Sequence, residues 1–128
     1  MLRSGSALTL AGYGPVVRTC LEAATAAEAD GHDLEVVDLR TLSPHDLDPV
    51  VESVRRTGRL VVVAEAPSEV SVTSEVAARV QELCFHSLEA PVLRVTGFDT
   101  PYPPARVEEE YLPDLDRVLD AVDRTFGF

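Results

Sequence analysis

The sequence predicts an α/β protein built on a mostly parallel β-sheet, and two observations carry that prediction. The first is residues 60–63 (LVVV), which lie between the turn signals Gly58 and Pro67 and show no polar alternation. Such a run is typical of a strand buried on both faces of a parallel sheet. The second is the order of the chain, because four short apolar segments alternate with longer segments of helical periodicity.

The first third of the chain predicts a strand, a helix and a possible edge strand. Residues 7–11 (ALTLA) form the strand, and residues 12–15 (GYGP) form a tight turn that leads out of it. Apolar and small side chains then recur at helical spacing over residues 16–29, and Gly31 ends that helix. Residues 2–3 are candidates for a short additional edge strand.

The middle of the chain predicts a second strand and a second helix. Residues 34–38 (LEVVD) form the strand. The helix ends at Gly58, and two starts are open for it. One start uses Ser43 as a side-chain cap, and the other begins at the Asp48-Pro49 pair.

The valine-rich strand, which we expect to be central, is followed by a loop at residues 68–73 and a helix from about Ser74. Residues 92–95 (VLRV) then predict a fourth strand. Three prolines and a glycine make residues 96–104 neither helix nor strand. The last helix is expected to begin near Pro113, a residue that favours the first helical turn.

Composition and charge narrow the class of protein. The 128 residues suit one domain over residues 1–128, and neither a membrane span nor the apolar core of a signal peptide is present. Cys20 and Cys84 lie far apart in predicted helices, so buried free thiols are favoured over a disulfide or a reactive site. We therefore expect a cytoplasmic protein. The net charge of −11 argues against binding nucleic acid or anionic membranes.

Three motifs are candidate sites. The turn at residues 12–15 is placed where a phosphate could bind, but it lacks the third glycine of the dinucleotide fingerprint, and the chain contains no lysine. Glu65, at the end of the valine-rich strand, is the best candidate for a functional carboxylate. The alternative for Glu65 is a carboxylate that only bonds neighbouring backbone N–H groups. Ser68 lies in the loop that follows, without a Gly-x-Ser-x-Gly motif.

His32, His45 and His86 show no metal-ligand spacing, so solvated or capping roles are favoured over metal binding. Acidic residues concentrate at the end of the chain, where residues 99–128 carry eight acids and three arginines, a net −5. This excess predicts either a solvated helix face or a docking surface for a basic partner. Its exposed charges should be Asp116, Asp120 and Asp123, since Leu115, Val118, Leu119 and Val122 form the apolar stripe.

Several sequence motifs together resemble a known family. They are residues 39–44 (LRTLSP), 57–63 (TGRLVVV), 65–67 (EAP) and 88–91 (LEAP). In this order they resemble the C-terminal domain of the E1 β subunit of 2-oxo acid dehydrogenases, in the transketolase C-terminal superfamily. Residues 80–85 (VQELCF), 97–103 (GFDTPYP) and 110–116 (EYLPDLD) are most similar to the branched-chain subgroup.

The resemblance implies a three-layer α/β/α sandwich with a five-stranded mixed sheet, one edge strand being antiparallel. It implies an α2β2 enzyme whose thiamine diphosphate and Mg are held by other domains, so that this chain binds no cofactor or metal and has no catalytic residue. The implied partners are other E1 domains, the α subunit, a second copy of the chain and a small basic domain of E2. The interface candidates are Glu65, Pro67, Asp99, Pro101, Tyr102, Asp116, Asp120, Asp123 and Phe128.

The chain departs from the family pattern in two places. Residues 64–67 read Ala-Glu-Ala-Pro where His-Glu-Ala-Pro is common in the family, so Ala64 replaces the histidine. Residues 68–74 (SEVSVTS) replace a glycine-rich segment. The hypothesis is a non-catalytic assembly and docking domain of a branched-chain 2-oxo acid dehydrogenase. The alternatives are a stand-alone small-molecule enzyme that uses Glu65 and Ser68, and a regulatory nucleotide-binding domain that uses residues 12–15.

Overall fold

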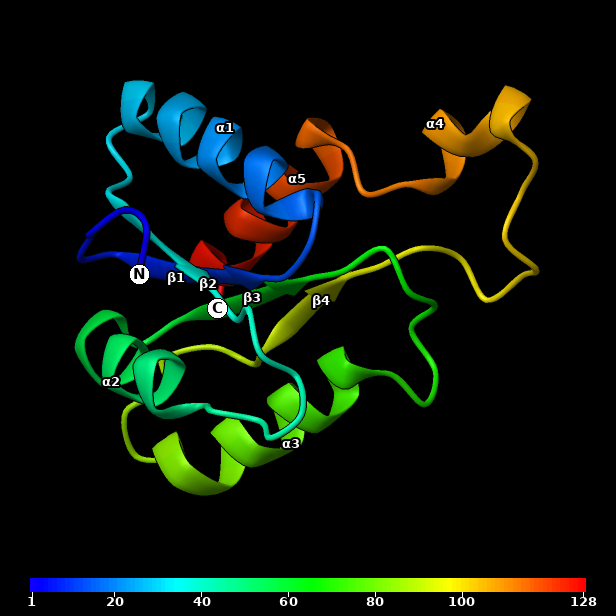
Figure 1. Ribbon diagram of the computed structural model, residues 1–128. Coiled ribbons are helices and arrows are strands. Elements are labelled where there is room, and N and C mark those ends of the chain that lie inside the picture. Colours follow the sequence, from blue (N-terminus) through cyan, green and yellow to red (C-terminus); the bar gives the residue numbers. More distant parts are fainter.

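The computed structural model describes all residues from 1 to 128, and its centre is a four-stranded parallel sheet (Figure 1). The strands are β1 (Leu8–Gly12), β2 (Leu34–Asp38), β3 (Leu60–Val63) and β4 (Leu93–Val95). They lie in the order β2-β1-β3-β4, and every neighbouring pair is parallel. The predicted α/β class and parallel sheet are confirmed, and β1 and β3 share the interior of the sheet.

Helices cover both faces of the sheet and complete three layers. On one face lie α1 (Val16–Ala29) and α5 (Leu115–Phe126), and on the other lie α2 (Asp48–Thr57) and α3 (Val72–Cys84) (Figure 1). Each pair of helices encloses its own apolar core against the strands. None of these helices is both long enough and apolar enough to cross a membrane.

The valine-rich strand β3 is buried on both faces, as its sequence predicts. Val61 and Val63 belong to the core under α1 and α5, whereas Leu60 and Val62 belong to the core under α2 and α3. All four side chains are fully buried. Burial of each such side chain stabilises the fold by about 1.5–3 kcal/mol, so β3 contributes to both cores at once.

The expected antiparallel edge strand is reduced to a single bridge. Arg3 forms an antiparallel bridge with Val36 of β2, and the Leu2 N–H donates to the Val36 carbonyl over 2.8 Å. The sheet therefore has four parallel strands, at the lower end of the four to five expected. Pairing stops because the chain turns at Gly5, whose N–H donates to the Glu35 carboxylate over 3.3 Å.

The structure decides between the two starts left open for α2 and moves the expected start of α3. Helix α2 begins at Asp48, so the start at Ser43 is wrong and the Asp48-Pro49 alternative is right. The Asp46 carboxylate accepts the Asp48 N–H over 3.1 Å, which satisfies a donor of the first turn, and Pro49 has no N–H to satisfy. Helix α3 begins at Val72 rather than near Ser74, which shortens the expected loop.

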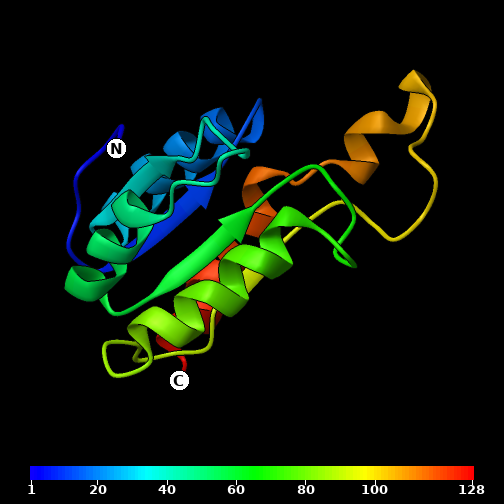
Figure 2. The same ribbon diagram turned by 60° about the horizontal axis from the view of Figure 1, so that its bottom comes forward.

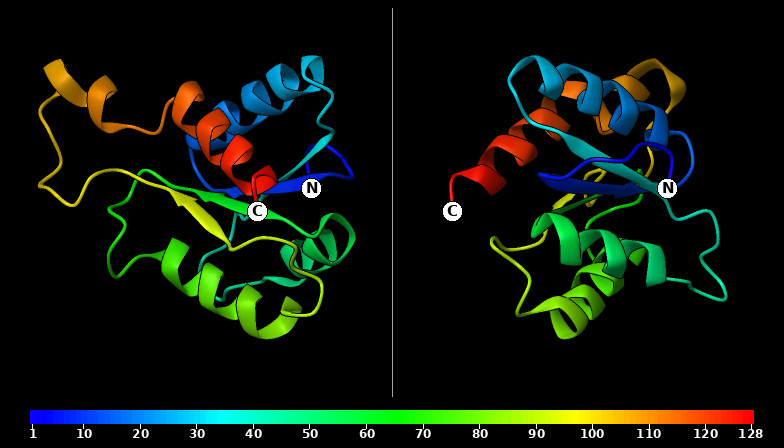
Figure 3. Two further views of the ribbon diagram at one scale, coloured as in Figure 1. Left: turned by 180° about the vertical axis from the view of Figure 1, so that it is seen from behind. Right: turned by 90° about the vertical axis from the view of Figure 1, so that its left-hand side faces the viewer.

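A projecting arm, residues 97–112, follows β4. Its first part is irregular, as the prolines predict, but it continues into the 3-10 helix η1 (Ala105–Val107) and the short helix α4 (Glu108–Tyr111). Neither helix was expected from the sequence. The arm extends away from the layered body, as Figure 2 and the left-hand view of Figure 3 show. Helix α5 then begins at Leu115, two residues after the expected Pro113.

Candidate functional site

The carboxyl ends of β1 and β3 meet where the connections diverge to opposite faces of the sheet. From β1 the chain continues to α1, and from β3 it continues to α3 on the other face. Open α/β sheets place binding sites at such a point. Tyr13 follows β1 and Glu65 follows β3, and both are half-buried. Burial, followed by the charge of Glu65, raises the pKa of Tyr13, so the two side chains interact electrostatically.

The arm brings more aromatic side chains to this edge. The rings of Tyr102 and Tyr111 meet edge to face with centroids 5.1 Å apart, and Phe98 meets Tyr111 at 6.2 Å. The Tyr102 hydroxyl donates to the Glu108 carboxylate. That hydrogen bond raises the pKa of Tyr102 to about 12, with smaller contributions from burial and from the charges of Glu108 and Glu65. Phe98 and Tyr102 are half exposed, so the cluster presents aromatic surface to solvent.

Gly97 is where the arm leaves the sheet, and only glycine fits there. A Cβ atom at this position would overlap the Glu65 carbonyl and the Tyr111 ring. The arm therefore crosses directly over the exit of β3. On its other side, the Arg117 guanidinium lies 4.8 Å from the Phe98 ring centroid and donates to the Thr96 carbonyl over 2.5 Å. The base of the arm is thus fixed from both sides.

Asp99 fastens the arm to the loop after β3. Its carboxylate accepts the Ser68 N–H over 2.8 Å, the Ser68 hydroxyl over 2.7 Å and the Glu69 N–H over 3.1 Å. The Ser68 hydroxyl, more than any other group, lowers the pKa of Asp99. The Arg94 guanidinium donates to the Ser68 carbonyl and to the Ser74 hydroxyl, each over 2.7 Å. Side chains therefore hold a loop in which the sequence has no glycine.

Val70 takes a backbone conformation in this loop that usually requires glycine. Its φ of +47° lies in the left-handed region, and its side chain is fully exposed. Branched side chains rarely adopt this backbone conformation because Cβ crowds the neighbouring peptide. The loop keeps its shape through the Asp99 and Arg94 contacts, although the residue at its tip is strained.

The exposed side of α5 is acidic, as predicted. Asp114 caps the helix, its carboxylate accepting the Arg117 N–H over 2.8 Å. Asp116, Asp120 and Asp123 are all exposed, whereas Val118 and Val122 are fully buried. The helix therefore turns a carboxylate face outward along most of its length.

The carboxyl end of α5 is fixed by aromatic contacts. The Phe126 ring stacks on His32 with centroids 4.1 Å apart, and the Arg59 guanidinium lies 4.9 Å from the same ring centroid. Arg59 also pairs with Glu89 over 2.5 Å. Phe128 follows with 72% of its surface exposed, so an exposed aromatic residue lies just after the anchored helix.

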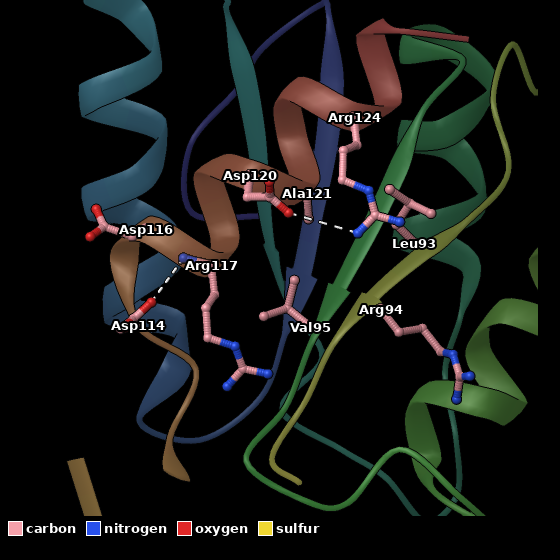
Figure 4. A pocket seen from close by; sticks show the side chains of 9 residues that line it. All are labelled: Leu93, Arg94, Val95, Asp114, Asp116, Arg117, Asp120, Ala121 and Arg124. Atoms are coloured by element: carbon pink, nitrogen blue, oxygen red, sulfur yellow. Dashed lines mark hydrogen bonds and ion pairs between the residues drawn. The ribbon is translucent and has the colours of Figure 1, made fainter. Parts of the chain in front are cut away.

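A groove lies between α5 and strand β4, with a volume of about 390 Å³ (Figure 4). Apolar side chains from both elements and equal numbers of acidic and basic side chains line it. The apolar residues are Leu93, Val95 and Ala121. The acidic residues are Asp114, Asp116 and Asp120, and the basic residues are Arg94, Arg117 and Arg124. The sequence did not predict this groove, because its two halves come from elements that lie far apart in the chain.

The structure separates the interface candidates into two surfaces. Glu65, Pro67, Asp99, Pro101 and Tyr102 lie at the carboxyl edge and along the arm, and Pro67 and Pro101 are exposed there. The second surface is α5 with its carboxylates, followed by Phe128. The arm helices η1 and α4 were missed, although the run of three glutamates at residues 108–110 is a signal for a first helical turn.

The remaining candidates are the two cysteines and the three histidines, and their surroundings are structural. Both cysteines are buried free thiols, as predicted, and burial raises the pKa of Cys20 to about 12. His32 stacks on Phe126, and His86 meets Phe85 edge-on. His45 forms a bridge with Leu42, and its Nε2 has no hydrogen-bond partner. No group of three or more His, Cys, Asp or Glu side chains could hold a metal ion.

The fold and these surfaces define a three-layer α/β/α domain whose projecting arm and last helix present aromatic and acidic side chains. Comparison with known proteins gives the family. The chain belongs to the transketolase C-terminal domain family, whose model matches residues 1–118.

Curated relatives are β subunits of dehydrogenases. The chain is 56% identical over 128 residues to the pyruvate dehydrogenase E1 component subunit beta of Leifsonia xyli subsp. xyli, covering 100% of this chain and 38% of that protein. It is 52% identical over 124 residues to the 3-methyl-2-oxobutanoate dehydrogenase subunit beta of Mycobacterium tuberculosis, covering 95% of this chain and 35% of that protein. The chain thus spans little more than a third of these relatives.

A solved structure has the same fold. A chain described as "Split gene transketolase, inactive beta4 tetramer" superposes with a TM-score of 0.79 at 31% identity. The match covers 97% of this chain and 39% of that chain. The similarity extends through nearly the whole three-layer fold.

Proposed function

We propose that the chain is a non-catalytic assembly and docking domain of a thiamine-diphosphate-dependent branched-chain 2-oxo acid dehydrogenase E1 β subunit. The observation that carries the proposal is the identity of 52–56% to E1 β-type subunits over nearly the whole chain. The chain forms one domain over residues 1–128 and works in the cytoplasm, where its two buried thiols stay reduced. The complete complex performs the oxidative decarboxylation.

The branched-chain substrate is the finer part of the proposal. It is supported by similarity to the 3-methyl-2-oxobutanoate dehydrogenase subunit and, at 47% identity, to the 2-oxoisovalerate dehydrogenase subunit beta of Pseudomonas aeruginosa. Both names describe branched-chain 2-oxo acids. The pyruvate dehydrogenase relative makes pyruvate the competing substrate. Turnover of the two acids by the complete enzyme that contains this domain distinguishes them.

Thiamine diphosphate and Mg belong to other domains of the complete enzyme in this proposal. The residues at the carboxyl edge do not fit a diphosphate group, because Glu65, Asp99 and Glu108 make that edge acidic. The chain has no lysine, and the Arg94 guanidinium near Asp99 already donates to the Ser68 carbonyl and the Ser74 hydroxyl. The edge and the arm are better suited to contact the other E1 domains and the α subunit, through the half-exposed rings of Phe98 and Tyr102.

The acidic face of α5 is the proposed docking surface for a small basic domain of E2. Asp116, Asp120 and Asp123 are exposed and extend over two turns of one helix. Complementary charge raises the association rate of such a pair more than it raises the final affinity. A face that serves only solubility would show no partner dependence.

Association with the cognate basic E2 domain tests the docking proposal. The variant with Asp116, Asp120 and Asp123 all changed to Asn should associate on the order of tenfold more slowly at low salt, and its rate should depend less on salt. The matched control removes three exposed carboxylates from the opposite face, as Glu52→Gln, Glu75→Gln and Glu82→Gln on α2 and α3. Equal rates for the two triple variants would show that α5 is not the docking face.

A further inference from the structure

The loop between β3 and α3, residues 64–71, is held in one shape by side-chain hydrogen bonds. The Asp99 carboxylate accepts the Ser68 N–H over 2.8 Å and the Ser68 hydroxyl over 2.7 Å. The Ser68 carbonyl accepts the Ser71 hydroxyl over 3.3 Å and the Ser74 hydroxyl over 3.1 Å. These contacts all lie within the chain, so the loop is ordered without a partner.

The tip of this loop, Val70, is strained, and nothing in the isolated chain offsets that strain. Its φ of +47° is unfavourable for a branched side chain. Its side chain is fully exposed, so it buries no apolar surface in the fold. Strained backbone of this kind gathers at functional sites, where it sets a geometry in advance. An apolar side chain on an ordered loop loses little conformational entropy when a partner covers it.

The loop and the arm form one surface at the carboxyl end of the sheet, because Asp99 joins them (Figure 2). Its exposed apolar side chains are Val70 at the loop tip and Phe98 and Tyr102 on the arm. The Glu69 and Asp99 carboxylates are exposed beside them. A partner that fits this surface is apolar where it meets Val70 and basic around that point.

We propose that Val70 is the anchor residue with which this surface binds the α subunit of the complete enzyme. Its side chain enters an apolar socket on that subunit, and basic side chains around the socket face Glu69 and Asp99. The α subunit is the partner because the loop is continuous with the arm, which the proposed function assigns to that contact. The inference rests on the proposed function and adds the residue that anchors the contact and the chemistry of the opposite surface.

Calorimetric titration of the full chain with the cognate α subunit tests the proposal. Val70→Ala removes two methyl groups from the socket and should weaken binding on the order of tenfold. Val70→Gly removes the whole side chain and should weaken binding at least as much. The same glycine variant should resist urea better than the wild-type chain, because glycine relieves the strained backbone. Weaker binding by a more stable chain identifies an anchor, since a residue that only supports folding would change both in the same direction.

Leu83→Ala is the matched control. Leu83 is also apolar and exposed, but it lies near the opposite end of α3, so its truncation should leave binding to the α subunit unchanged. Wild-type affinity of both Val70 variants would overturn the inference and leave the assembly role standing.

Two further outcomes separate this inference from the proposed function. A chain that binds the basic E2 domain but not the α subunit would overturn the inference alone, as would Val70 variants that lose only E2 binding. A wild-type chain that binds neither partner would overturn the inference together with the proposed function.

Discussion

Two polar residues of the core strands have partners that the fold supplies. The Thr9 hydroxyl of β1 lies 2.6 Å from the Ser53 hydroxyl and 2.8 Å from the Thr57 hydroxyl of α2. Glu35 of β2 is buried as well, and its carboxylate is paired with Arg56 over 2.6 Å. Because buried polar groups without partners are costly, these contacts fix how α2 lies on the sheet.

Val62 offers no such partner, so a charge there should unfold the chain. Val62→Asp would bury an unpaired carboxylate at a position with no exposed surface, at a cost of about 3–5 kcal/mol. That is comparable with the whole stability of many domains. Val107→Asp, at an exposed position on the arm, is the control and should melt near the wild-type temperature. A soluble Val62→Asp variant with an unchanged cooperative transition would contradict the burial of β3.

Val70 should be improved by glycine. A left-handed backbone at a branched residue costs about 1–3 kcal/mol, whereas glycine adds about 0.5–1 kcal/mol of unfolded-state entropy. Val70→Gly should therefore stabilise the chain by about 1 kcal/mol in urea unfolding. Val70→Ala keeps the Cβ atom and should gain much less. Equal stability of the glycine and alanine variants would show that the backbone at this position is not strained.

At the scale of elements, the connections after β3 and β4 depend on each other. The loop after β3 and the arm after β4 are fastened by Asp99, whose three accepted hydrogen bonds all come from Ser68 and Glu69. Arg94 of β4 adds a contact to the beginning of α3 through Ser74. The surface at the carboxyl edge is therefore one linked unit rather than two independent loops.

This link should be pH-dependent in a defined direction. Hydrogen bonds from the Ser68 hydroxyl and the Glu69 amide hold the pKa of Asp99 below its ordinary value of 3.8. Stability from a lowered carboxyl pKa is present above the ordinary pKa and is lost as pH falls through the lowered value. Hydrogen exchange at the Ser68 and Glu69 amides should show protection that is complete above about pH 4 and is lost only as the pH falls further, through the lowered pKa of Asp99.

Asp99→Ala should expose these two amides at neutral pH, because it removes the Oδ1 atom that accepts both of them. Asp123→Ala, whose carboxylate makes no hydrogen bond to the loop, should leave their protection unchanged. If both amides stay protected in Asp99→Ala, other contacts hold the loop.

At the scale of the whole molecule, charge and exposed rings are distributed unequally. The net charge is −11, and carboxylates cover α5 and the carboxyl edge, whereas the β4–α5 groove is balanced. Aromatic rings gather on the arm. The arm itself lies outside the layers of the body (Figure 2). The molecule thus has surfaces of different chemistry, as the proposed assembly role requires.

The same charge distribution predicts that the isolated chain does not bind thiamine diphosphate. A diphosphate would approach an acidic edge that has no lysine and no cluster of metal-ligating side chains. Calorimetric titration with the cofactor and Mg²⁺ should give no micromolar binding, while the complete enzyme in parallel should give a binding signal. Micromolar affinity of the isolated chain would contradict the assignment of the cofactor to other domains.

The sequence by itself determined the parallel strands, the buried thiols and the acidic face of α5. Each follows from local pattern: the valine run predicts β3, and the apolar spacing around Val118 and Val122 places Asp116, Asp120 and Asp123 outward. Side-chain periodicity is set by backbone geometry over a few residues, so it can be read without knowing the rest of the fold.

Only the tertiary structure decided the start of α2, the course of the arm, the strain at Val70 and the β4–α5 groove. These features depend on residues far apart in the chain, as when Asp99 bonds Ser68 across 31 positions. The groove likewise joins Leu93 and Val95 to Ala121, which no local pattern relates. Their positions are set by how the layers pack and by which polar groups then need a partner. Both are determined only when distant segments come together, so no local pattern predicts them.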